Sequence, residues 1–342
     1  MTGRRNSRDR ITIQDVAERA GVSKMTVSNV VNRTGKVGAA TRARVLGVIQ
    51  ELGYVPSQAA RHLVGAAAAR IGLVYRDVES MFLNVAITDI SVAVAERGLQ
   101  LLVRRARDAS PDETERVVRS LKRSGADGLV LLPPYPELLS GSALFRELGL
   151  PAVAIATASP LPDIATVRID NFAAARALTS LLIARGYRRI GFVTGPVRHS
   201  DSRARLEGYK AALEEHGLPF RADLCAEGLF TFASGIEAAD TLFGLVERPD
   251  AIMAANDDMA AAILWVAHSR NFKLPEDLAV TGFDDTLIAT RVWPTLTTIR
   301  QPLAEMADHA IDILVDALRK PPAATPQDRV VDFSLIERGS IR

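Results

Sequence analysis

The residues nearest the N-terminus that could do chemistry lie on one face of a short predicted helix, about residues 24–32. At roughly 100° per residue, an apolar stripe lies on one side of this helix and mostly polar side chains lie on the other. The stripe is Val27, Val30 and Val31, and the opposite side is Lys24, Met25, Ser28, Asn29 and Asn32. That side carries donors, acceptors, one cation and no acid. Such a face suits base edges in the major groove of DNA, between two rows of phosphates.

A second set of candidate residues follows short apolar segments in the rest of the chain. Each segment is typical of a buried strand, and the candidates stand after it or near the start of the next predicted helix. They are Phe82, Asp170, Asp201, Arg205, Phe230, Asn256 and Asp284. A cation, acids, an amide and aromatic rings that converge on one cleft suit a polyhydroxylated ligand, because they can bind its hydroxyls and stack on its apolar face.

Several of these residues have a structural alternative. Phe82 could simply pack against its own helix, and Asp170 could be a helix N-cap. One member of Asn256-Asp257 is expected to cap a helix, which leaves the other to face a ligand. Arg76 also follows a predicted strand, and it belongs to the same class of positions.

Enzymatic and metal chemistry find no support in the sequence. It has no HExxH, GxSxG, P-loop or GxGxxG pattern. The histidines have no metal-ligand spacing and are expected to be structural or solvated; they are His62, His199, His216, His268 and His309. We therefore predict no catalytic residues, no metal site and no cofactor.

The elements that position the first set form a predicted helix-turn-helix. Thr12 and Asp15 have the spacing of a capping box, Gly21 can end the first helix, and Ser23 can cap the second. Two helices of about eight residues around a glycine turn have the dimensions of this motif. A third helix, about 41–52, is expected to bury Val45, Leu46, Ile49 and Leu52.

Charge is distributed unevenly along the chain. Residues 1–64 contain eleven Lys and Arg against four Asp and Glu, whereas the whole chain of 342 residues has 42 against 40. A basic head on a mildly acidic body is typical of a nucleic-acid-binding module. Residues 1–10 precede no apolar run, so we expect a disordered basic arm and not a signal peptide. One cysteine, Cys225, and no membrane-length apolar run favour the cytoplasm and no membrane partner.

Beyond the head, apolar strands alternate with amphipathic helices. Strands are expected at about 71–75, 99–103, 128–132, 152–156, 190–194, 251–255 and 278–283, and helices at about 83–97, 111–124, 137–148, 171–185, 202–216, 234–246 and 257–270. The pattern predicts an α/β domain over 70–342 with parallel sheets covered on both faces. We expect two subdomains, about 70–168 with 302–328 and about 169–301 with 329–338. A helix at 302–319 and a late strand at 329–335 cross back between them.

The head resembles the DNA-binding domain of the lactose-repressor (LacI/GalR) family. The resemblance lies in IQDVAERAGVSKMTVSNVVN, in Thr41-Arg42, in LGYVP at 52–56 and in ARHL at 60–63. It implies a DNA-binding domain over 11–56, with base contacts from Lys24, Met25 and Asn29. Supporting contacts, mostly to phosphates, would come from Ser23, Thr26, Ser28 and Asn32. Many family members have arginine in the place of Asn29, and asparagine suits adenine where arginine suits guanine.

The segment 57–69 resembles the family's hinge helix and linker. A helix of about eight residues is too short to be stable alone, so it should form only beside its twin on DNA. The resemblance implies DNA contacts from Ala60 and Leu63, with Leu63 wedged into the minor groove. The alternative is that Leu63 is an ordinary buried leucine at the domain junction.

The body resembles the effector domain of the same family, a periplasmic-binding-protein-like fold. The strings are GPVRHSDSRARLEGY, AANDDMAAA, VTGFDDT and LTTIRQP. They imply effector contacts from Asp170, Arg205, Phe230, Asn256 and Asp284. His199 and Asp201 stand where purine-responsive members have a basic residue and a threonine, which favours a sugar or sugar derivative as effector.

The resemblance implies a homodimeric repressor of carbohydrate genes that leaves a pseudo-palindromic operator when the effector binds between the subdomains. Three alternatives remain. The protein could be a corepressor-dependent or activating member of this family. From other classes, it could be a sugar-binding transport protein or a sugar-modifying α/β enzyme.

Overall fold

The computed structural model describes residues 12–31, 37–52, 68–76, 79–319 and 325–342. The chain forms two compact units, Met1–Ala68 and Ala69–Arg342. The predicted arm, Asn32, and the hinge residues Ala60 and Leu63 lie outside the described residues.

The described part of the first unit, here the head, consists of α1 (Ile13–Ala20), α2 (Lys24–Val31) and α3 (Ala39–Leu52). The predicted capping box is present: the Thr12 backbone N–H donates to the Asp15 carboxylate at 2.7 Å, and the Thr12 hydroxyl accepts from the Asp15 N–H. Gly21 ends α1 with φ of 64°. The Thr26 N–H donates to the Ser23 hydroxyl at 3.1 Å, so Ser23 caps α2 as expected.

The core of the head is built from small and β-branched side chains of all three helices: Val16, Ala17, Ala20, Val27, Val30, Val45 and Val48. Two expectations are wrong. Ser28 is 6% exposed because it stands next to the valine stripe, where a short side chain is covered. Leu46, which was expected to be buried, is 49% exposed, and Val48 of the same helix lies in the core instead.

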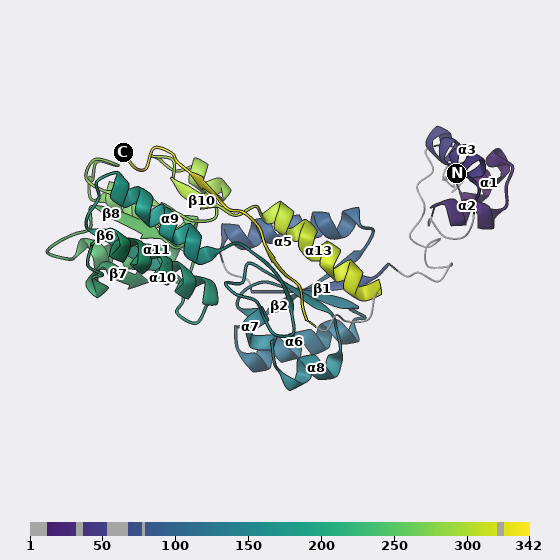
Figure 1. Ribbon diagram of the computed structural model, residues 1–342, viewed down its shortest axis with the longest axis horizontal. Helices are drawn as coiled ribbons and strands as arrows, with labels where there is room; N and C mark the ends of the chain where they lie inside the picture. The colour runs from purple at the N-terminus through teal and green to yellow at the C-terminus, as the bar shows by residue number, and fades with distance from the viewer. Residues whose placement is uncertain (1–11, 32–36, 53–67, 77–78, 320–324) are drawn as a thin grey trace, which may run out of the picture. The chain divides into compact units, whose positions relative to one another are not determined.

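The second unit contains a six-stranded parallel sheet with the order β11-β5-β4-β3-β1-β2. Its strands are β1 (Arg70–Arg76), β2 (Gln100–Ala106), β3 (Gly128–Leu131), β4 (Ala152–Ile155), β5 (Ala165–Arg168) and β11 (Asp328–Val330). Helices α5 (Met81–Glu96) and α13 (Leu303–Arg319) lie side by side on one face. Helices α6 (Pro111–Arg123), α7 (Tyr135–Leu139) and α8 (Ala143–Leu148) lie on the other (Figure 1).

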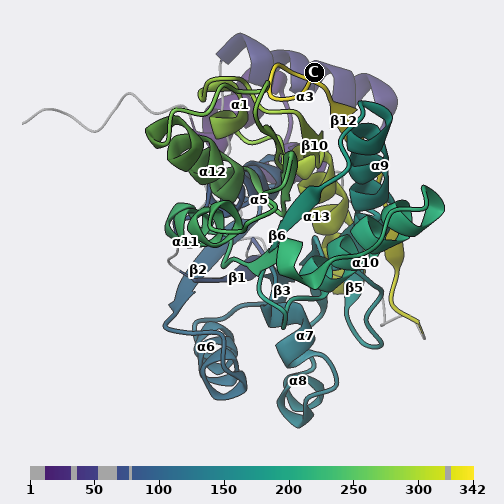
Figure 2. The same ribbon diagram turned by 90° about the vertical axis from the view of Figure 1, so that its left-hand side faces the viewer.

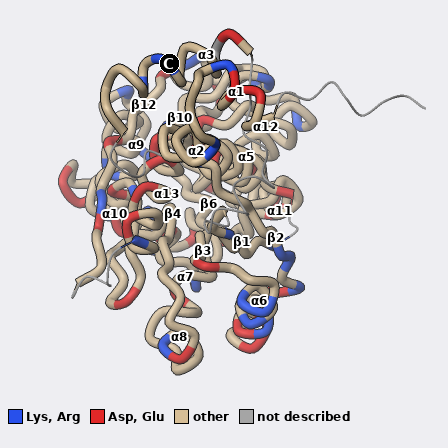
Figure 3. The backbone as a smooth tube through the Cα atoms, turned by 90° about the vertical axis from the view of Figure 1, so that its right-hand side faces the viewer, with Lys and Arg blue, Asp and Glu red and all other residues tan. Residues whose placement is uncertain are grey.

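The central strands of this sheet are buried on both faces. Leu73 and Val130 pack into the core on the α5 side, whereas Val74 and Leu129 pack into the core on the α6 side. Successive side chains along a strand point to opposite faces of the sheet, and here both faces are buried. Apolar residues are therefore needed at every position, which explains the continuous apolar runs in the sequence. The outer face of α6 carries both signs of charge (Figure 3).

A second parallel sheet has the order β7-β6-β8-β9. Its strands are β6 (Ile190–Thr194), β7 (Cys225–Glu227), β8 (Ala251–Ala254) and β9 (Ala279–Thr281). Figure 2 shows α9 (Asn171–Ala184) and α10 (Ser200–Glu215) on one side of β6, and α11 (Phe232–Phe243) and α12 (Asp257–Ser269) on the other. A small antiparallel pair, β10 (Thr298–Arg300) and β12 (Ser334–Ile336), completes the second unit.

The α/β class with parallel sheets is confirmed, and most expected elements are present within a few residues. Two expectations are wrong. The late strand at 329–335 is two strands, β11 in the first sheet and β12 beside β10. The helix at 137–148 is two short helices, because Gly141 adopts φ of 74° between them.

The chain leaves or enters the six-stranded sheet three times along these connections: from β5 to β6 of the second sheet, from β10 of the antiparallel pair to β11, and from β11 to β12. These crossings place the carboxyl ends of both sets of strands around one region of the second unit. Among the described helices, none is both long and apolar enough to span a membrane.

Candidate functional site

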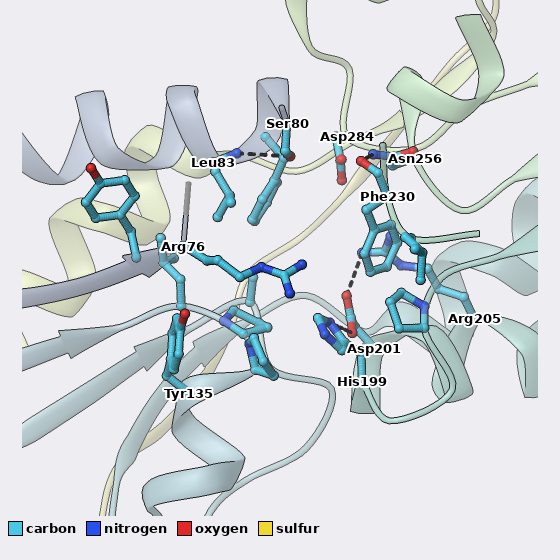
Figure 4. A pocket seen from close by; sticks show the side chains of 18 residues that line it. Arg76, Ser80, Leu83, Tyr135, His199, Asp201, Arg205, Phe230, Asn256 and Asp284 are labelled. Atoms are coloured by element: carbon cyan, nitrogen blue, oxygen red, sulfur yellow. Dashed lines mark hydrogen bonds and ion pairs between the residues drawn. The ribbon is translucent and has the colours of Figure 1, made fainter. Parts of the chain in front are cut away.

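A cavity of about 80 Å³ lies at the carboxyl ends of the strands of both sheets. Arg76 ends β1, Leu132 follows β3 and Ala156 follows β4, while Pro196 and Asn256 follow β6 and β8 of the second sheet. Parallel sheets bind ligands at these ends. Figure 4 shows the side chains that line the cavity. They are Tyr75, Arg76, Ser80, Phe82, Leu83, Leu132, Pro133, Pro134, Tyr135, Ala156, Pro196, His199, Asp201, Arg205, Leu229, Phe230, Asn256 and Asp284.

Six of the seven residues chosen from the sequence line this cavity: Phe82, Asp201, Arg205, Phe230, Asn256 and Asp284. Asp170 does not. It is exposed, and its carboxylate accepts from the Ala173 N–H at 2.9 Å as the N-cap of α9. The structure thus places Asp170 in the capping role, and the next residue, Asn171, contacts Arg205 instead.

Arg205 is buried, with only 3% of its surface exposed, and protein groups fix its guanidinium in place. Its Nε donates to Asn171 Oδ1 at 2.9 Å, and its Nη1 donates to the Ala255 carbonyl. Its guanidinium stacks on the Phe283 ring, with Cζ 3.7 Å from the ring centroid. Nη2 remains 3.8 Å from the Asp201 carboxylate. A guanidinium fixed on three sides is prepared to donate to a ligand without further ordering.

Asp201 lies between two basic groups at the start of α10. One of its oxygens is 3.8 Å from Nδ1 of His199, and the other faces Arg205. Within the described part of the chain, Asp201 Oδ1 is buried without a hydrogen-bond partner, and so is the Tyr135 hydroxyl on the other side of the cavity. Burial lowers the pKa of His199, which favours its neutral form.

Three residues that line the cavity have backbone conformations that side chains rarely adopt. Ala156, Phe230 and Asp284 have φ of 64°, 62° and 110°. Such conformations cost energy and gather at functional sites. Phe230 also packs against Gly195, where a Cβ would overlap the ring, so that position in the turn after β6 requires glycine.

Asn256 combines a capping role with a place in the cavity. Its side-chain oxygen accepts from the Met259 N–H at 3.0 Å at the start of α12, and its amide nitrogen donates to the Phe230 carbonyl at 3.0 Å. The sequence left open which of Asn256 and Asp257 caps the helix. Asp257 is instead buried beneath the site, where it accepts from Thr286 and Thr298.

Asp284 is buried at the floor of the cavity and accepts from Gln301 Nε2 at 2.7 Å. Burial raises the pKa of Asp284 well above its usual value, although the charge of Arg205 opposes the shift. Burial also raises the pKa of Asp257 to about 7. Burial therefore favours the protonated form of both carboxyls. A protonated carboxyl can donate a hydrogen bond as well as accept one.

Several residues of the cavity are not among the seven ligand candidates chosen from the sequence. Arg76 and Tyr75 come from the end of β1, and His199 from the turn before α10. The sequence placed Arg76 in the right class of positions, directly after a predicted strand, and His199 lies two residues before Asp201, but neither was chosen as a ligand-binding residue. The wall of Leu132, Pro133, Pro134 and Tyr135 has no comparable signal.

The head presents most of the predicted DNA-facing residues on its surface. Ser23, Lys24 and Met25 are exposed, and the Met25 side chain is 65% exposed although it is apolar. Thr26 and Asn29 are half-buried, and Ser28 is buried. Among the described residues, no group of three or more His, Cys, Asp or Glu could hold a metal ion.

Comparisons with known proteins agree with both units. Residues 12–57 match the model for bacterial regulatory proteins of the lacI family, and residues 179–341 match a periplasmic binding protein-like domain. The transcriptional regulator CelR of Thermobifida fusca is 35% identical over 324 residues, which cover 91% of this chain and 93% of CelR. The chain belongs to the LacI family.

Other members of the LacI family extend the match. The ribose operon repressor of Escherichia coli K12 is 32% identical over 329 residues, 96% of this chain and 99% of that protein. A solved complex of CelR with cellobiose has a TM-score of 0.71 at 32% identity, covering 97% of this chain and 100% of the other. The solved Lac repressor dimer bound to operator and the anti-inducer ONPF has a TM-score of 0.74 at 25% identity, covering 97% of this chain and 99% of the Lac repressor chain.

Membership of the LacI family confirms the family resemblance, the fold class and the general function that the sequence predicted. The protein is a DNA-binding transcription regulator with a helix-turn-helix head and a periplasmic-binding-protein-like body. The relatives are transcription regulators and not enzymes or transport proteins.

Proposed function

We propose that the protein is a homodimeric cytoplasmic repressor of carbohydrate genes that leaves its operator when a sugar-like effector enters the cavity. The observation that carries this proposal is the convergence of Arg205, Asp201, Asn256 and Asp284 beside Phe82 and Phe230. Hydroxyl groups need donors and acceptors in a closed site, and unmet groups cost a few kcal/mol each. The buried Asp201 Oδ1 and Tyr135 hydroxyl supply such groups to a ligand.

The related proteins support a carbohydrate effector and a dimer on DNA. One relative is solved with cellobiose, and another as a dimer bound to operator. In our proposal the base-reading residues are Lys24, Met25 and Asn29, and the supporting contacts come from Ser23, Thr26 and Asn32. Ser28 would act through packing, because it is buried. Ala60 and Leu63 would enter the minor groove at the centre of the operator, an assignment that rests on the resemblance alone.

Selection of operators from random duplex DNA, followed by titration of the complex with sugars and their derivatives, tests the proposal. We expect a pseudo-palindrome whose complex dissociates when one of these ligands is added. A palindrome that no such ligand releases would contradict the inducer assignment and favour corepression. No selected sequence at all would contradict DNA recognition by the head.

Asn29→Arg sharpens the same experiment. Asparagine suits adenine and arginine suits guanine, so the variant should change the preferred base at one symmetric pair of positions, with a discrimination of about 1–3 kcal/mol. Met25→Ala, on the same helix, is the matched control and should not produce the same guanine preference. An unchanged consensus for Asn29→Arg would contradict the assignment of this face.

A further inference from the structure

We propose that the effector carries an anionic group, a carboxylate or a phosphate, and that Arg76 binds this group. The inference rests on the proposed carbohydrate function and adds to it the chemical class of the effector, an acidic sugar. It follows from the place of Arg76, from its lack of a partner among the described residues and from the charges that face the cavity.

Arg76 is the last residue of β1, and its half-buried side chain extends into the cavity toward Asp201 and His199 (Figure 4). Across the residues that the structure describes, its guanidinium makes no hydrogen bond and no ion pair. In the described part of the body, the other half-buried arginines all have partners. Arg97 pairs with Asp308 and Asp312, Arg168 with Asp328, Arg221 with Asp223 and Glu247, and Arg338 with Asp285, while the Arg70 guanidinium donates to the Ser124 carbonyl at 3.3 Å. Among these described half-buried arginines, Arg76 alone has no partner, and its side chain points into the cavity.

The surroundings of Arg76 make an enclosed, unpaired cation costly. The wall beside it is formed by Tyr75, Phe82, Leu83, Leu132 and Tyr135, none of which is an anion. Closing a ligand over this wall removes water from the guanidinium, and a desolvated charge without a partner is strongly unfavourable. Its charge is already felt in the site, because it adds to the lowering of the His199 pKa that burial causes.

The other charged groups of the cavity do not compensate Arg76. Asp201 stands between Arg205 and His199, each at 3.8 Å. Asp284 accepts from Gln301, and burial favours its protonated form. Two guanidinium groups therefore face the cavity, with Asp201 already engaged by one of them.

A ligand anion satisfies this arrangement. The planar fork of arginine donates two parallel hydrogen bonds to a carboxylate or a phosphate. The hydroxyls of the sugar would lie toward Arg205, Asn256 and Asp284, and the anionic substituent toward Arg76.

The test measures binding of matched ligands to the purified full-length protein by calorimetry. Glucose and galactose are each compared with their uronic acid and their 6-phosphate, at one pH and ionic strength. At least one acid should bind tenfold or more tightly than its neutral parent and release the selected operator. The uronate and phosphate arms identify which anion the site accepts.

Arg76→Gln should abolish the preference for the acid and change the affinity for the neutral sugar less than threefold. Arg76→Lys keeps the charge and should retain part of the preference. Arg104→Gln, on the neighbouring strand and exposed, is the matched control and should bind as the wild type does. Unchanged operator binding shows that each variant is folded.

Three results would overturn the inference. A wild type that binds a neutral sugar as tightly as its acid would contradict it while leaving the proposed function intact. If Arg76→Gln lowers the affinity for neutral and acidic ligands equally, Arg76 does not bind the anionic group and instead forms an ion pair with a protein carboxylate in the liganded state. Absence of binding by any carbohydrate, neutral or acidic, would overturn the proposed function and this inference together.

Discussion

The two walls of the cavity are built differently. The wall from the second sheet, here the polar wall, consists of Asp201, Arg205, Asn256 and Asp284, and each of these side chains already contacts another protein group. The wall from the first sheet, here the apolar wall, consists of Tyr75, Phe82, Leu83, Leu132 and Tyr135, with Arg76 beside it. The polar wall is thus ordered before a ligand arrives, whereas the apolar wall offers surface area, the Tyr135 hydroxyl and one charge that no described residue pairs with.

Hydrogen bonds connect the elements that carry the two walls. The Met81 N–H at the start of α5 donates to Asp258 at 3.0 Å. The Ser200 hydroxyl at the start of α10 donates to Glu137 of α7 and accepts from the Ala158 N–H, after β4, at 3.4 Å. Burial raises the pKa of both carboxyls, that of Asp258 to about 6. The comparison therefore leads to three experiments, on the polar wall, on the junction and on the apolar wall.

Arg205→Ala should have the largest effect, because it breaks the polar wall. It removes a prepared cation and also leaves Asn171 Oδ1 and the Ala255 carbonyl without their partner. We expect effector affinity to fall about 100-fold or more, roughly 3 kcal/mol, with operator binding retained. Calorimetry and operator release measure the two properties separately.

Arg203→Ala is the control for this variant. It lies on the same helix two residues away, and its side chain is exposed. Normal induction of the Arg205→Ala protein would show that the polar wall does not bind the effector.

Asp258→Asn should stabilise the protein at neutral pH. The folded-state pKa of about 6 lies above the unfolded value of about 3.9, so the folded state binds more protons between these values. Stability contributed by the protonated carboxyl is lost as pH rises through 6, and asparagine does not titrate. The variant should therefore be more stable by about 3 kcal/mol at pH 7.5 and by only about 1 kcal/mol at pH 4.5.

Denaturant unfolding at both pH values measures this difference, and Asp112→Asn, which is exposed on α6, is the control. A variant that loses stability equally at both pH values would contradict the raised pKa of Asp258 and show that the hydrogen bond from Met81 matters more to stability than the charge.

Phe82→Ala should have the smallest effect of the three, because the apolar wall contributes area and not fixed hydrogen bonds. Loss of one stacking ring should weaken effector binding roughly tenfold, about 1.4 kcal/mol. Phe172→Ala, on α9 and 39% exposed, is the control and should not change affinity. A loss as large as that of Arg205→Ala would remove the distinction between the walls.

Local patterns in the sequence predicted much of the fold and several of the residues that line the cavity. The capping box of Thr12 and Asp15, the glycine that ends α1, and the strands around Leu73, Val130 and Met253 were found because each depends on neighbours a few residues away. Six of the seven ligand candidates line the cavity for a related reason. A polar residue just after a buried strand must emerge at the edge of its sheet.

Other features escaped because they depend on distant neighbours. The residues 328–336 divide between two sheets, since β11 pairs with β5 and β12 pairs with β10. Ser28 is buried because it stands next to the valines of α2 that pack against the other helices of the head. Asp170 faces outward as a cap while Asn171 turns toward Arg205, a choice between adjacent residues that no periodicity encodes.

The sequence by itself determined the helix-turn-helix head, the alternation of strands and helices, and the residue types at the strand ends, because hydrophobic period and capping are local properties. Only the tertiary structure decided which strand ends meet. The sheet orders bring Arg76 of β1 into one cavity with Arg205 and Asp284, far along the chain. Whether a charged side chain there has a partner depends on all the elements that surround it, and that balance of charge is what defines the ligand.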